Sequence, residues 1–328
     1  MTAGDLFAAS FITGRDIQIA RDDRFYATPS IKSLREVYEN TVRSIRSDLI
    51  ALECPLPQIQ VVESDTENFA VGSTICPTAE CVREAVSKLA VRISGLPGDA
   101  RALVRAGSLI EQHNLFTLYT VMMVGWVVGF RAIKDPFIYP SELDFESGLT
   151  AFQDKGPKDQ TKSRLMRIPG MALAQIEAYS KYQRECLSLF PNELQGRLYF
   201  IEELPNGFFF RQVTASVIEQ YLEEYLPLPA NASRHFGRTE LIERGFCPQY
   251  VSAWLAHFFR GEEPWGKYLT FSFKNYCGFM QDQLPKVLKQ DLGFRAIDND
   301  GREIIDYGPD IERFRRRGEA RARASRKS

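Results

Sequence analysis

The feature that most constrains the fold is an apolar run of sixteen residues without a charge, from Leu115 to Phe130. A membrane-spanning helix needs about 20 such residues. This run is shorter, and it lies between His113 and Arg131 within one continuing helical pattern. We therefore expect a buried core helix in a soluble protein.

Composition places the chain among ordinary globular proteins. Its 328 residues are 44% hydrophobic and 25% charged, and this length allows two domains with separate cores. The six cysteines form no C-x-x-C pair and show no metal-ligand spacing, so a reduced intracellular protein is expected. The first ten residues do not resemble a secretion signal. The predicted location is cytoplasmic.

Hydrophobic periodicity predicts a helical N-terminal part, in which Ser30 to Leu52 is an amphipathic helix with several basic residues. A second helix is expected from Thr78 to Ile93, and the Gly-Leu-Pro-Gly stretch at 95–98 is the best linker candidate. The predicted regions are a helical N-terminal region (1–97), a second domain (98–292) and a C-terminal extension with a basic tail (293–328).

The second part mixes helices with short strands, so the predicted fold class is mainly α with a small antiparallel β-sheet, an α+β fold. Strands are expected at Leu149–Gln153 and Arg164–Ile168, with a further short hairpin around 198–210. Predicted helices span 100–112, 115–128, 170–189, 213–225, 234–244, 248–258 and 273–288. Pro285 is expected to kink the last helix or end it early.

Six residues have the side chains that metal-free cleavage of a DNA phosphodiester requires: Arg131, Lys155, His235, Arg238, His257 and Tyr268. This reaction needs a nucleophile, cations for the charge that builds on the phosphate oxygens, and an acid for the departing 5′ oxygen. Arginine suits the phosphate because its planar guanidinium donates two parallel hydrogen bonds and keeps its proton. We therefore expect a site without metal or cofactor.

Four of these residues are candidates for binding the phosphate. Arg131 directly follows the apolar helix, and Arg238 lies three residues after His235, on the same face of a predicted helix. His257 follows another apolar helix face and is expected to donate to the phosphate. These residues taken singly also have structural explanations. An arginine after a helix often caps it, and a His-x-x-Arg pair is often part of a solvated helix face.

The acid and the nucleophile are expected on connecting segments. Lys155 lies on the turn between two predicted strands and is the candidate general acid, with Lys158 and Lys162 as competitors. Tyr268 follows a glycine-flanked segment that would deliver its phenol to phosphorus. Tyr276 is a second candidate nucleophile.

Residues 100–285 or so resemble the catalytic domain of the tyrosine recombinases, the phage-integrase family. The resemblance rests on Gly129-Phe130-Arg131, Asp154-Lys155-Gly156 leading to Arg164-Leu165-Met166-Arg167-Ile168-Pro169, His235-Phe236-Gly237-Arg238, Leu255-Ala256-His257, and Tyr268. It implies that Arg131 and Arg238 bind the scissile phosphate and that Lys155 protonates the 5′ oxygen. His235 and His257 would assist proton transfer and phosphate binding, and Tyr268 would form a 3′-phosphotyrosyl bond.

The chain departs from the usual pattern of this family at four places, one of which is a slightly long interval from His257 to Tyr268. Thr239 stands where histidine often follows the second arginine, and Ala256 stands where glycine usually precedes the last histidine. The acidic residue common three positions after the first arginine is replaced by Lys134, which Asp135 follows. None of these changes removes a group that the chemistry needs, so an active but divergent member is expected.

The resemblance implies that residues 98–292 are the catalytic domain and that the helical region 1–97 is a core DNA-binding domain. It also implies double-stranded DNA as partner, a homotetramer on paired DNA sites, and a site-specific recombinase or integrase of a mobile element, associated with the nucleoid. Accessory DNA-bending proteins are further candidate partners, and no membrane is involved. A topoisomerase IB-like or resolvase-like strand transferase, or a catalytically inactive DNA-binding relative, is the alternative.

Charge is distributed unevenly along the chain. The net charge is -1, yet the segment Arg313–Ser328 carries +7, which leaves -8 on residues 1–312. Such a tail is typical of a basic arm that contacts phosphates, or of a solvated terminus.

Overall fold

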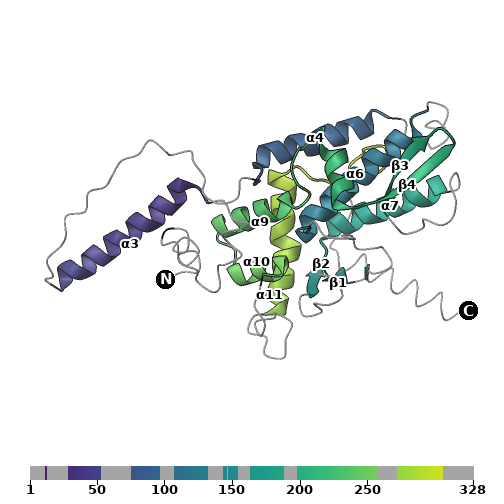
Figure 1. Cartoon of the computed structure of the whole chain (residues 1–328). Coiled ribbons are helices and arrows are strands. Elements are labelled where there is room, and N and C mark those ends of the chain that lie inside the picture. Colours follow the sequence, from purple (N-terminus) through teal and green to yellow (C-terminus); the bar gives the residue numbers. More distant parts are fainter. Residues whose placement is uncertain are drawn as a thin grey trace, which may run out of the picture. The chain divides into compact units, whose positions relative to one another are not determined.

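The structure is a computed structural model, and it describes residue 12 and residues 29–52, 75–96, 107–131, 143–145, 147–153, 163–187, 198–257 and 272–305. The chain divides into two compact units: Met1–Cys76 with Arg234–Ser252, and Pro77–Ser233 with Ala253–Ser328. The described residues are mainly helical with two small antiparallel sheets (Figure 1). The expected α+β class is therefore confirmed, with two separate hairpins where one sheet was expected.

The elements follow one another in a simple order. The helices are α3 (Ile31–Ala51), α4 (Ala79–Ser94), α6 (Leu109–Val128), α7 (Gly170–Leu187), α8 (Ala215–Leu222), α9 (Ala232–Glu243), α10 (Pro248–Leu255), α11 (Phe273–Gly278) and α12 (Leu284–Lys286). Two π-helical segments are η5 (Phe279–Gln283) and η6 (Val287–Asp291). The strands are β1 (Leu149–Gln153), β2 (Ser163–Arg167), β3 (Tyr199–Leu204) and β4 (Gly207–Gln212).

Helix α3 confirms the amphipathic helix expected in the N-terminal region. Ser30 caps it, because its hydroxyl oxygen accepts a hydrogen bond from the backbone N–H of Ser33 at 3.0 Å. None of its residues is buried, and Tyr38 and Ile45 are about half exposed. Its charged and its apolar side chains are therefore both at the surface.

Helix α6 is the core of the second unit, as its apolar run predicts. Of its 20 residues 17 are buried, and it packs against α4, α7, α8 and β3. The expected break between two helices near residue 113 is wrong, because α6 runs through His113 and Asn114. Both polar side chains hydrogen-bond the backbone of β3, so they are satisfied within a continuous helix. Among the described residues, no helix is long and apolar enough to cross a membrane.

Both hairpins lie where alternation predicts strands. Strand β1 pairs antiparallel with β2, with Leu149 opposite Arg167 and Gln153 opposite Ser163. Strand β3 pairs antiparallel with β4, and its Tyr199 lies opposite Gln212. The second hairpin packs on α6 through β3, so it belongs to the core of the second unit.

The last helical region continues past Pro285, so of the two predicted outcomes, a kink or an early end, the early end is wrong. Proline has no N–H, and its ring crowds the carbonyl four residues earlier. Here π-helical turns lie on both sides of the short α12 that contains Pro285, and the helical course continues to Asp291. A π-helical turn forms its hydrogen bonds five residues apart, which accommodates the missing donor.

The three predicted regions remain a prediction, and Pro97 and Gly98 of the linker lie outside the described residues. What the structure does show is that α4 is tied to the elements that follow it. Arg92 of α4 forms ion pairs with Glu111 of α6 at 2.8 Å and with Glu224 at 3.0 Å.

Candidate functional site

Helix α6 is followed by a sharp turn that leads to Arg131. Gly129 has φ 56°, a left-handed conformation that glycine adopts readily because it has no Cβ. A Cβ atom there would lie 3.0 Å from side-chain atoms of both Trp254 and Leu255. Position 129 therefore favours glycine for two reasons, its left-handed backbone and its close packing on Trp254 and Leu255 of α10.

Arg164 of β2 joins the ends of α6 and α10. Its side chain is 0% exposed. Its Nη1 atom donates to the backbone oxygen of Val128 at 2.6 Å and also to that of Trp254. Val128 is the last residue of α6 and Trp254 the last but one of α10, so neither oxygen has a partner within its own helix. One buried cation thus satisfies both helix ends.

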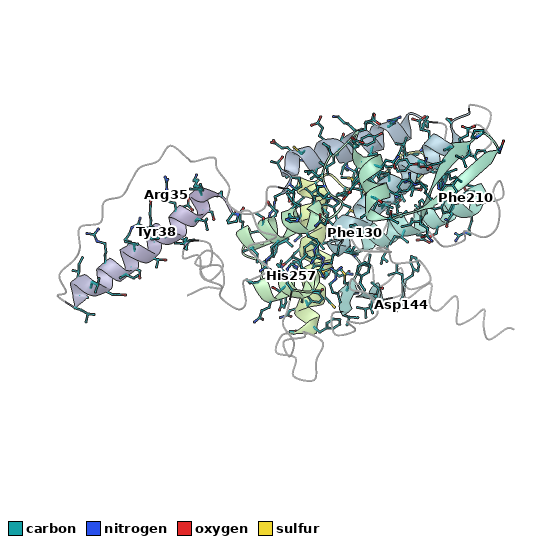
Figure 2. All side chains as sticks on the ribbon, viewed as in Figure 1. Arg35, Tyr38, Phe130, Asp144, Phe210 and His257 are labelled. Atoms are coloured by element: carbon teal, nitrogen blue, oxygen red, sulfur yellow. The ribbon has the colours of Figure 1, made fainter. Side chains whose placement is uncertain are left out.

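These contacts join the segments that lead to two predicted site residues, Arg131 and His257. Arg131 follows Val128 by three residues, and His257 follows Trp254 by three, a distance of at most about 11 Å along the chain in each case. Figure 2 labels His257 and Phe130, the residue before Arg131. The Nη1 atom of Arg131 is buried and has no hydrogen-bond partner within the part of the chain that the structure describes. A buried guanidinium donor of this kind suits an anion.

His257 follows a residue with an unusual backbone. Ala256 has φ 54°, and it is the one non-glycine residue with positive φ among those described. For a residue with a side chain this conformation costs roughly 1–2 kcal/mol. The position therefore favours glycine. His257 itself is 8% exposed.

The pair His235 and Arg238 lies on α9, as predicted. Residues three apart share a helix face, and both side chains are 1% exposed. An Arg238 Nη1 atom donates to the hydroxyl oxygen of Ser252 on α10 at 3.2 Å. The hydroxyl of Thr239 donates to the backbone oxygen of His235 at 3.0 Å. The local packing of α9 thus holds both motif residues.

Lys155 and Tyr268, with the competitors Lys158 and Lys162, lie outside the described residues. The structure does describe Tyr276, the second candidate nucleophile, on α11. Its side chain is 0% exposed. Burial raises the pKa of its phenol, and the charge of Arg164 acts in the opposite direction. A phenol in this position is shielded from a DNA phosphate.

Sequence reasoning missed two buried arginines. Arg164 and Arg234 are both 0% exposed. A signal for Arg164 was present, because Arg164, Met166 and Ile168 alternate with more exposed neighbours in and after β2 and strands place alternate side chains on one face. No comparable pattern indicates the burial of Arg234, which directly precedes His235.

Comparison with known proteins identifies no similar protein. No family model matches the chain, and neither the curated proteins nor the solved structures include one that is significantly similar to it. Within the described residues, no group of three or more His, Cys, Asp or Glu side chains is arranged to hold a metal ion.

Proposed function

We propose that this protein is a DNA strand transferase of the tyrosine-recombinase type, which cleaves and rejoins DNA through a 3′-phosphotyrosyl intermediate without metal. The observation that carries the proposal is the joining of the ends of α6 and α10 by Arg164. This contact joins Val128, three residues before the first arginine of the motif set, Arg131, to Trp254, three residues before its last histidine, His257. These residues are 126 positions apart in the sequence.

In the proposed reaction the phenol oxygen of Tyr268 attacks phosphorus, a P–O bond to tyrosine forms, and the bond to the 5′ oxygen breaks. The phenol gives up its proton to a basic group, for which His235 and His257 are the candidates. Lys155 gives a proton to the 5′ oxygen. Rejoining reverses each transfer, so atoms and charge balance over the cycle.

Arg131 and Arg238 are proposed to neutralise the charge on the phosphate oxygens. Fixed cations that meet developing charge are worth on the order of 10²–10³ in rate for each donor removed. The buried Nη1 of Arg131 supports this role, because such a donor needs an acceptor, and a phosphate oxygen is a strong one.

Tyr268 is the proposed nucleophile in preference to Tyr276. Tyr276 is fully buried, and its raised pKa opposes the loss of the phenol proton that attack requires. Tyr268 lies between His257 and α11 in the chain, the place where the resemblance expects the nucleophile.

The test uses the full-length protein and a suicide DNA substrate with a nick near the cleavage site, so that the covalent complex accumulates. Wild type should form a covalent adduct in EDTA, and Tyr268→Phe should bind DNA normally yet form none, because only the nucleophilic hydroxyl is lost. Tyr276→Phe is the matched control and should form the adduct. An adduct from Tyr268→Phe together with none from Tyr276→Phe would reverse the assignment, and a strict need for Mg²⁺ would contradict the mechanism.

Double-stranded DNA and a homotetramer on paired sites are the proposed partners. The exposed helix α3, which carries Lys32, Arg35, Arg43 and Arg46, is proposed to contact DNA phosphates and so set register rather than sequence. Strand exchange between paired sites would identify a site-specific recombinase, whereas relaxation of supercoils alone would identify topoisomerase IB-like activity.

A further inference from the structure

Arg164 contacts several helices and strands. Besides its bonds to the ends of α6 and α10, its guanidinium carbon lies 4.9 Å from the ring centroid of Phe152 on β1. Its charge also acts on the phenol of Tyr276 on α11. The side chain itself comes from β2, the partner strand of β1. One residue therefore links β1, β2, α6, α10 and α11.

Burial of a cation requires compensation, and the two helix ends supply it. Removing a charged group from water costs several kcal/mol in a protein interior. The carboxyl ends of helices carry partial negative charge, and two of them meet the same nitrogen of Arg164. The ring face of Phe152 adds a favourable contact with the cation. Because of these contacts, the position of the guanidinium depends on both helix ends, and the position of each helix end depends on the guanidinium.

We propose that Arg164 is a positioning residue for the strand-transfer reaction, which sets the placement of Arg131 relative to His257 by holding the last turns of α6 and α10 together. The inference rests on the proposed function. It goes beyond the six motif residues, because Arg164 touches neither DNA nor the reacting atoms in this scheme. Its influence reaches the phosphate through Arg131 and His257.

A displacement of about 1 Å in a catalytic group can lower a rate on the order of 10²-fold. Arg164→Met keeps much of the buried volume but donates no hydrogen bond to Val128 or Trp254, so its single-turnover cleavage rate at saturating DNA should fall about 100-fold. Arg164→Lys keeps a cationic donor at the end of a shorter side chain, so its rate should fall about tenfold, a partial rescue. The DNA dissociation constant should stay within about twofold in both variants.

Arg167→Met is the matched control on the same strand. Its side chain is on the alternate face, where Nε donates to the backbone oxygen of Ser147 at 3.1 Å, so the cleavage rate should remain near that of wild type. A purely structural role for Arg164 would lower the melting temperature but leave the rate of the folded fraction unchanged, and that result would overturn the inference.

A double mutant keeps the test decisive if Arg164→Met does not fold. If Arg164 acts through Arg131, the effects of Arg164→Lys and Arg131→Lys on the cleavage rate should not multiply. In the Arg131→Lys background, Arg164→Lys should then lower the rate by less than about threefold. Full multiplication of the two effects would overturn the inference. Wild type that forms no covalent adduct would instead overturn the proposed function, so the two failures are distinguishable.

Discussion

At the scale of single residues, two left-handed backbone positions directly precede the segments that carry Arg131 and His257. Gly129 ends α6 with φ 56°, and Ala256 follows α10 with φ 54°. Arg131 comes two residues after the first and His257 one residue after the second. The two turns therefore set the direction of the chain that leads to Arg131 and to His257. A substitution at Gly129 or Ala256 should affect both the stability of the fold and the proposed DNA cleavage.

Gly129→Ala should be costly for this reason. Alanine at this position must adopt a left-handed backbone conformation, and its Cβ would lie 3.0 Å from side-chain atoms of Trp254 and Leu255. We expect the free energy of unfolding to fall by about 2–4 kcal/mol, measured by urea denaturation. Gly107→Ala is the control, since Gly107 has φ 68° but a Cβ added there would meet nothing within 4 Å. It should lose only about 1 kcal/mol, and equal losses would show that the contact with α10 is unimportant.

His113 should make stability depend on pH. Burial lowers the pKa of its imidazole to about 4, whereas the unfolded chain has a value near 6.5. As the pH falls from about 6.5 to 4, the unfolded state takes up a proton that the folded state does not, so stability is lost over this window. The loss should reach about 3 kcal/mol below pH 4.

The contribution of His113 is separated from that of the carboxylates by comparing wild type with His113→Gln. Glutamine retains an N–H donor for the backbone oxygen of Tyr199, which His113 Nε2 bonds at 3.0 Å, but it does not titrate. Urea denaturation between pH 7 and pH 4 should give a steeper loss for wild type. Parallel curves for the two proteins would refute the assignment.

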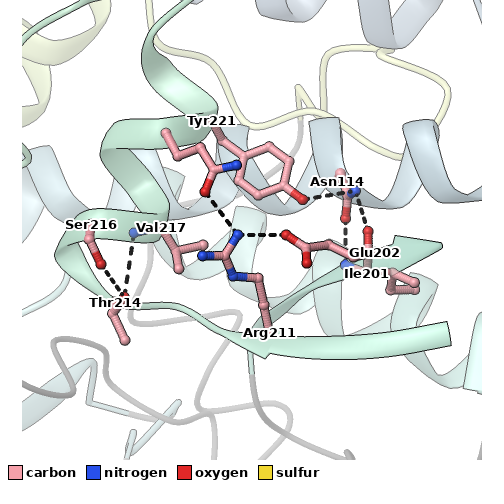
Figure 3. Close-up of polar contacts among 9 residues, drawn as sticks. Asn114, Ile201, Glu202, Arg211, Thr214, Ser216, Val217 and Tyr221 are labelled. Carbon is pink, nitrogen blue, oxygen red and sulfur yellow. Dashed lines mark hydrogen bonds and ion pairs between the residues drawn. The ribbon is translucent and has the colours of Figure 1, made fainter. Parts of the chain in front are cut away.

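At the scale of elements, the outer edge of β3 is covered by a side chain of α6. The amide of Asn114 donates to the backbone oxygen of Ile201 and accepts from its N–H, both at 2.8 Å (Figure 3). The same Asn114 nitrogen lies 3.4 Å from the hydroxyl of Tyr221. A strand edge leaves such backbone groups without partners unless another element covers them. Asn114 therefore attaches the β3–β4 hairpin to the core helix.

Asn114→Leu should lower the free energy of unfolding by about 2–4 kcal/mol, because two backbone groups of the buried Ile201 lose their partners. Tyr221→Phe removes only the long hydrogen bond and should cost less than about 1 kcal/mol. Urea denaturation of both variants provides the measurement. A loss for Asn114→Leu no larger than that for Tyr221→Phe would mean that water replaces the amide at the strand edge.

At the scale of the whole molecule, the uneven charge bears on the proposed binding of DNA. The net charge of -1 arises from a basic segment, Arg313–Ser328, and an acidic remainder; this tail lies outside the described residues. If it contacts phosphates, binding releases counterions and depends steeply on salt. Deleting Arg313–Ser328 should weaken DNA binding and flatten the plot of log affinity against log salt concentration. An unchanged slope would identify a solvated tail.

Much of the fold was predictable from sequence because helices and strands bury their faces with different periods. The 3.6-residue period located α3, α4 and α7, the uncharged run located α6, and alternation located both hairpins. The order of the motif residues, from Arg131 to Tyr268, was equally readable, since chain order needs no tertiary information. For His235 and Arg238 the helical period also predicted their shared face on α9.

Only the tertiary structure decided which partners satisfy the polar groups. His113 and Asn114 resemble a helix break in the sequence, but a strand edge distant in the chain binds them and lets α6 continue. Pro285 stays within a helical course because π-helical turns flank it. Arg164 is charged and hence expected at the surface, yet two helix ends hold it in the core. Local sequence determines periodicity, whereas the burial of a polar group depends on partners that folding brings from far along the chain.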